Sequence, residues 1–163
     1  MTSPAYLGAG VERRVRRVRR ILWALLGLLA IEFALGMAVN LFVSLSLPSG
    51  YPELLSVIES SGILSAHTVV AILLLFGSVV LCTQTGKPFL ARVRGLSVLL
   101  TVTLVGTIFM GYSFVESQSN AFSYGMAMGF LVAFLLVVGL IHSVYEKGRL
   151  VLAPETTKIT VGG

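Results

Sequence analysis

Glu32 and His67 are the residues whose types and positions could support chemistry in this sequence. Each is the only Asp, Glu, His, Lys or Arg residue within a long apolar run, around AIEFAL in one case and SAHTVV in the other. Ionisable groups are costly inside a lipid bilayer, and the ones that occur there commonly mark functional sites. The two positions therefore direct attention to proton handling, ligand binding or hydrogen bonding between helices.

The imidazole of His67 has three possible roles. It could bind haem iron or Cu(I) together with a methionine thioether, it could handle protons, or it could be a polar residue satisfied by Asn40, Tyr124 or Thr68. Four of the five methionines are expected at its depth. Within that set, the candidates for a second axial haem ligand are Met110 and Met126.

His142 does not form a haem ligand pair with His67. At the ~1.5 Å rise per helical residue, the two histidines lie at heights that differ by roughly 20 Å or more. Axial ligands of one haem must face each other across the iron, so this difference in height excludes the pair. His142 instead belongs to an interfacial belt with Tyr145 and Glu146.

Glu32 lies near the middle of the first apolar run, where it should face the bundle or a partner. It could handle protons or pair with another protein, and the alternative is a neutral interhelical hydrogen bond to Ser78, Thr101 or Thr103. Counting ~1.5 Å per residue places Glu32 and His67 roughly 10–15 Å apart along the membrane normal. The sequence therefore predicts that water or another group must lie between them.

These residues require helices that cross a membrane. Each of four apolar runs has at least the ~20 residues that span the hydrocarbon core, and only internally paired backbone is stable there. Short connections favour antiparallel neighbours. We expect an all-α, integral membrane, up-down-up-down four-helix bundle over residues 21–145, preceded by a basic arm and followed by a tail, with these boundaries: arm 1–20, spans 21–47, 62–82, 95–114 and 121–145, tail 146–163.

All twelve Lys and Arg residues precede the first run, separate the second from the third, or follow the fourth. This asymmetry predicts a protein of the plasma membrane with both termini in the cytoplasm. Before the first run the sequence RRVRRVRR should form a basic collar that attracts anionic lipid headgroups. The collar consists of Arg13, Arg14, Arg16, Arg17, Arg19 and Arg20.

The composition excludes several functional classes. Only 12% of the 163 residues are charged, about half the usual share, and there is no aspartate. The net charge of +5 is explained by topology and does not indicate nucleic-acid binding. The single Cys82 excludes an internal disulfide and a cysteine metal cluster. We recognise no catalytic motif, and we expect no catalytic activity of its own.

The chain resembles the small four-helix membrane cytochromes of the b type and the half-units of haem A synthase. The resemblance consists of four spans, short loops, cytoplasmic ends and a histidine near the outer end of the second span, in SAHTVVA. It implies haem b as a cofactor on His67. Those families carry a second histidine near the outer end of the fourth span, where this chain reads AFSYGMAMG.

We therefore expect an accessory or structural subunit of a larger membrane complex, in a respiratory or electron-transfer setting, whose partners are the bilayer and other membrane subunits. An autonomous haem-binding electron carrier that uses His67 is the alternative. A small transporter that uses Glu32 is a third hypothesis, which the short loops and the lack of clearly broken helices disfavour.

Overall fold

The computed structural model describes residues 4–42, 61–85, 91–117 and 119–152, and these residues form helices. All four helices are long and apolar enough to cross a membrane, which confirms the expected multi-pass, all-helical class. Residues 43–47 of the first expected span and most of the tail lie outside the described part. The helices are α1 (Pro4–Phe42), α3 (Gly62–Gln84), α4 (Ala91–Ser117) and α5 (Asn120–Leu152).

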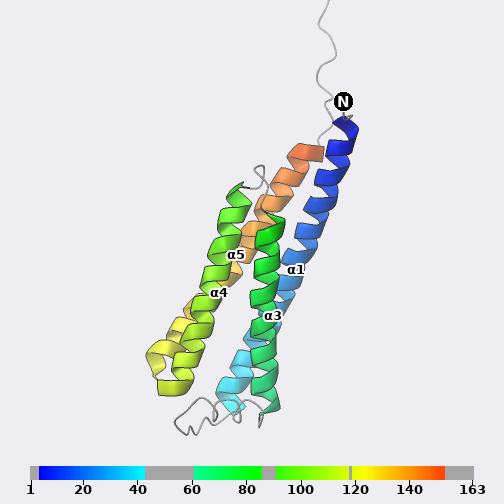
Figure 1. The fold of residues 1–163 in the computed structure, drawn as a ribbon. Coiled ribbons are helices and arrows are strands. Elements are labelled where there is room, and N and C mark those ends of the chain that lie inside the picture. Colours follow the sequence, from blue (N-terminus) through cyan, green and yellow to red (C-terminus); the bar gives the residue numbers. More distant parts are fainter. Residues whose placement is uncertain (1–3, 43–60, 86–90, 118, 153–163) are drawn as a thin grey trace, which may run out of the picture.

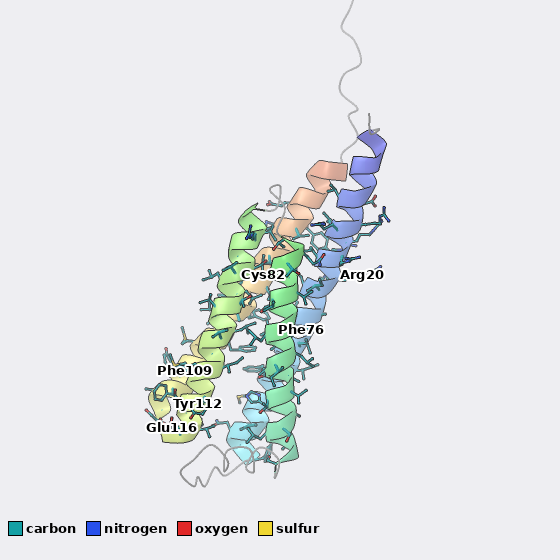
Figure 2. All side chains as sticks on the ribbon, viewed as in Figure 1. Arg20, Phe76, Cys82, Phe109, Tyr112 and Glu116 are labelled. Carbon is teal, nitrogen blue, oxygen red and sulfur yellow. The ribbon has the colours of Figure 1, made fainter. Side chains whose placement is uncertain are left out.

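The helices pack as two close pairs, α1 with α3 and α4 with α5 (Figure 1). The pairs are joined by contacts of α1 with α5 and of α3 with α4. Figure 1 shows the last described turns of α1 beside the first turns of α3. We call the end of the bundle that carries Arg20 and Cys82 the arginine end (Figure 2), and the other end, near Glu116, the far end.

Ring contacts show that α1 and α5 run in opposite directions. The guanidinium carbon of Arg19 lies 5.3 Å from the ring centre of Tyr145, and the ring centres of Phe33 and Phe130 are also 5.3 Å apart. From the first contact to the second, the residue number rises by fourteen along α1 and falls by fifteen along α5. The two contacts lie at different heights and fix the register of this helix pair.

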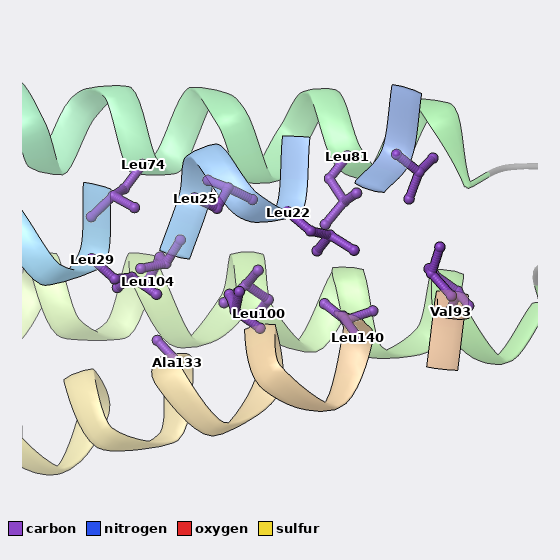
Figure 3. Close-up of a cluster of buried hydrophobic side chains, with 13 residues drawn as sticks. Leu22, Leu25, Leu29, Leu74, Leu81, Val93, Leu100, Leu104, Ala133 and Leu140 are labelled. Carbon is purple, nitrogen blue, oxygen red and sulfur yellow. The ribbon is translucent and has the colours of Figure 1, made fainter. Parts of the chain in front are cut away.

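The buried core is concentrated toward the arginine end (Figure 3). Leu100 of α4 is 1% exposed and lies in a cluster to which all four helices contribute. Within this cluster, the members from α1 extend no further than Leu29 and those from α3 begin at Leu74. The other members are Val18, Leu22, Leu25, Leu81, Val93, Leu104, Ala133, Val137, Leu140 and Val144.

The outward surface of the helices is apolar over most of its length. Phe76 of α3 and Phe109 of α4 are 65% and 61% exposed, and many Leu, Ile and Val side chains are similarly open (Figure 2). An exposed apolar surface of this extent would be a liability in water, but lipid tails solvate it. The surface agrees with a chain whose main solvent is lipid.

The basic segment is structurally continuous with the first span. α1 runs without interruption from Pro4 to Phe42, so its 39 residues extend about 58 Å at ~1.5 Å per residue. Val18, which lies between arginines, is fully buried in the core cluster. The helix therefore continues through residue 20 into the first span, and Val18 of the arginine segment packs in the bundle core.

Gly129 of α5 is a position where α4 and α5 approach each other closely. A Cβ built there would overlap the Thr107 hydroxyl of α4, which donates a hydrogen bond to the Thr103 carbonyl oxygen. We expect Gly129→Ala to lower the free energy of unfolding by about 1–3 kcal/mol, because either the Thr107 side chain gives up this position or the helices move apart. Unfolding in mixed detergent micelles measures this loss.

Gly139, on the same helix, is the matched control, because a Cβ there meets nothing within 4 Å. Gly139→Ala should be neutral or stabilising, since alanine favours the helix over glycine. Removing the hydroxyl with Thr107→Ala should recover much of the stability lost in Gly129→Ala. Equal losses at both glycines would contradict the expected close approach of α4 and α5.

Candidate functional site

Glu32 of α1 and His67 of α3 contact each other directly. Their Oε1 and Nδ1 atoms are 3.1 Å apart, and the side chains are 11% and 29% exposed, respectively. The expectation that roughly 10–15 Å separates the two residues is therefore wrong. The estimate assumed heights from the limits of the apolar runs, whereas packing between α1 and α3 sets their relative height.

Contacts at two glycines show the register that brings the two residues together. A Cβ built at Gly77 of α3 would lie 2.8 Å from Cδ2 of Leu25, and a Cβ built at Gly36 of α1 would lie 3.5 Å from Cε1 of His67. From the first contact to the second, α1 advances by eleven residues while α3 goes back by ten. The helices are thus antiparallel here, and His67 lies against the face of α1 that carries Gly36.

Glu32 and Gly36 lie one turn apart on that face of α1, because residues four positions apart are neighbours on a helix surface. The imidazole ring therefore packs against Gly36, and Glu32 places a carboxyl oxygen beside it. The contact of His67 with Gly36 was not expected from the sequence, where the glycine lies four residues after an intramembrane carboxyl group.

The pair retains unused hydrogen-bonding capacity. Nδ1 of His67 and Oε2 of Glu32 are buried atoms that have no hydrogen-bond partner among the described residues. The 3.1 Å separation is a close polar contact, but it does not meet the alignment that a formed hydrogen bond requires. A small rotation of the ring or the carboxyl group would allow the bond to form.

The polar partners that the sequence offered for His67 lie elsewhere. Tyr124 is 70% exposed, and Asn40 is also exposed. The Thr68 hydroxyl donates a hydrogen bond to the Leu64 carbonyl oxygen of its own helix. Among the described residues, the polar contact of His67 is with Glu32.

The partners expected for Glu32 form a separate contact between α3 and α4. The Thr101 hydroxyl donates to Ser78 Oγ at 3.1 Å and lies 3.5 Å from the sulfur of Cys82. Thr103 donates to the Leu99 carbonyl oxygen of its own helix. Ser78 is fully buried. The Ser78 and Thr101 hydroxyls thus join α3 to α4, and the structure places none of the three hydroxyls in a hydrogen bond with Glu32.

Met110 and Met126 pack reciprocally against glycines. A Cβ built at Gly125 of α5 would lie 3.3 Å from the sulfur of Met110, and one built at Gly111 of α4 would lie 3.1 Å from the sulfur of Met126. Haem binding by His67 with one of these methionines stays a prediction that this packing does not favour. The sulfur atoms contact the opposite helix of the α4–α5 pair, while His67 contacts Glu32.

The other ionisable groups of the described helices lie near the ends of the bundle. In the charged segment of α1, Arg16 forms an ion pair with Glu12 at 2.6 Å. On α5, His142 Nε2 lies 3.3 Å from Glu146, and the two side chains are 75% and 64% exposed. Within the described part of the chain, no three His, Cys, Asp or Glu residues gather as they would to hold a metal ion.

No protein-family model, no curated protein and no solved structure matches this chain. The Glu32–His67 pair must therefore be interpreted from its own geometry. Two residues that each stand alone in an apolar helix, 35 positions apart, are brought together by the fold. The site is an acid and a base in contact within the apolar part of a helical bundle.

Proposed function

We propose that this chain is an accessory or structural subunit of a larger membrane complex, in a respiratory or electron-transfer setting, without catalytic activity of its own. The observation that carries the proposal is that polar side chains of the spans contact each other between helices. Two polar contacts join helices, Glu32 with His67 and Thr101 with Ser78, while most of the exposed side chains of the spans are apolar. Such a surface is suited to lipid and to other membrane helices.

The proposal includes an up-down-up-down topology with both termini in the cytoplasm. Antiparallel contacts of α1 with α3 and with α5 support the topology. The concentration of basic residues supports the orientation. In this arrangement the arginine collar, whose Arg16, Arg17, Arg19 and Arg20 are exposed, faces anionic headgroups on the cytoplasmic side.

Purification of the full chain from its native membrane in mild detergent tests the subunit role. We expect other membrane proteins to co-purify in fixed stoichiometry, and we expect removal of this chain to lower the amount of their assembled complex. Tags on both termini should be labelled only after the membrane is opened. A homogeneous preparation containing this chain alone, with all membrane complexes intact after its removal, would contradict the proposal.

The same preparation distinguishes the alternative of an autonomous haem carrier. A Soret band that is lost in His67→Ala and retained in His142→Ala would favour the carrier over the accessory subunit. The His142 side chain is 75% exposed, so its removal should not disturb the bundle. For the subunit proposal we expect no such band from the chain by itself.

A further inference from the structure

We propose that Glu32 and His67 form a two-residue proton relay between α1 and α3. The inference goes beyond the subunit role, because it gives this part of the chain a substrate, the proton. It stands on three observations: the 3.1 Å contact, the buried atoms without partners at the contact, and the position of the pair within apolar segments.

Both groups can take up a proton on one side and release it on the other. Uptake at Nε2 by a neutral imidazole that carries its proton on Nδ1 gives the positively charged ring. When Nδ1 then gives its proton to Oε1 of the carboxylate, the N–H bond breaks, an O–H bond forms, and a neutral imidazole faces a neutral carboxyl group. A half-turn of the carboxyl group carries the O–H bond to the side that Oε2 occupied, where the proton leaves, and a half-turn of the ring again places an N–H bond beside the carboxylate.

A proton transfer within the pair changes no net charge in its apolar surroundings. The charged pair and the neutral pair both have zero net charge, so the transfer leaves no isolated charge in lipid. Either group alone in its charged form would bear the full penalty of burial. Once the two groups are aligned, a proton can therefore pass between them without a counter-charge from a third residue.

Among the described residues, the helices packed around the pair add no other charged side chain at its level. α1 has Glu32 alone between Arg20 and Phe42, and α3 has His67 with the distant thiol of Cys82. α4 packs against α3, and α5 packs against α1. Away from the charged residues at the arginine end, the titratable groups of these two helices are two phenols and one carboxylate. They are Tyr112, Glu116 and Tyr124.

The geometry also gives the relay two distinct ends. His67, 29% exposed, is the more accessible group, and its Cε1 edge lies over Gly36. Glu32, 11% exposed, presents the buried and unpartnered Oε2. A water molecule or a hydrogen-bonding group of a partner protein at Oε2 would complete the path at the buried end.

Nitrogen-15 NMR of histidine in the full chain, reconstituted in bilayers, tests the relay. The chain has two histidines, so His142→Gln leaves the signals of His67 alone. We expect the Nδ1 resonance of His67 to lie between the positions of a protonated and a bare ring nitrogen, because the proton is shared. Glu32→Gln should shift that resonance to the position of an ordinary neutral imidazole.

Glu116→Gln is the matched control, since this exposed carboxyl group lies at the far end of the bundle (Figure 2). It should leave the His67 signals unchanged. A His67 Nδ1 resonance at either pure position, or one that does not respond to Glu32→Gln, overturns the relay. If Glu32→Gln does not fold, the position of the resonance in the His142→Gln protein decides the question by itself.

Discussion

Replacing Glu32 and His67 together by leucine is expected to leave the bundle folded and about as stable as the original chain. Replacing His67 alone should lower the free energy of unfolding by about 3 kcal/mol, because the carboxyl group of Glu32 would lose its polar neighbour in an apolar site. Apolar replacement of both partners removes the desolvation cost as well as the contact. Unfolding in bilayer-like bicelles measures the four corners of this double-mutant cycle.

The cycle isolates the coupling between the two side chains. If they interact, the loss in the double variant is smaller than the sum of the losses in Glu32→Leu and His67→Leu. Additive losses would show that the 3.1 Å contact has no energetic weight. The control pair is Glu146 and His142 at the arginine end, where 64% and 75% exposure should make the coupling weak.

The second large effect is expected in the core. Leu100 is 1% exposed, and Figure 3 shows it in the middle of the cluster formed by all four helices. We expect Leu100→Ala to lower the free energy of unfolding by about 2 kcal/mol, the lower end of the range for core leucines. In lipid the loss comes from packing contacts, because leucine is as well solvated by lipid tails as by the protein interior.

Leu99, the preceding residue on the same helix, is the natural control, because 50% of it is exposed. Leu99→Ala should change the free energy of unfolding by less than about 0.5 kcal/mol. Both variants can be measured by the same unfolding titration. Similar losses at the two positions would mean that the cluster in Figure 3 does not hold the bundle together.

The sequence predicted the helices well because lipid leaves few options for a backbone. A peptide group in hydrocarbon must be paired within its own segment, so four apolar runs of sufficient length predict four helices. The described limits are mostly wider than the expected ones, as in α4, which runs from Ala91 to Ser117 where 95–114 was expected. The end turns of these helices contain polar residues, so a limit drawn from apolar residues alone places the helix ends too far inward.

The sequence also identified Glu32 and His67 as unusual, since a polar residue in an apolar run is visible without a structure. It did not predict that they touch. Contact depends on the register of α1 against α3, in which Leu25 lies against Gly77 and His67 lies against Gly36. The expected hydroxyl partners of Glu32 were wrong for the same reason, because Ser78 and Thr101 meet at the α3–α4 contact.

The composition of single segments was enough to indicate a lipid solvent, four helices long enough to cross a membrane and two isolated ionisable residues. Which residues meet could not be read from one segment at a time, because helix register depends on how the side chains and glycines of two helices fit together. The contact of Glu32 with His67 is the result of that fit.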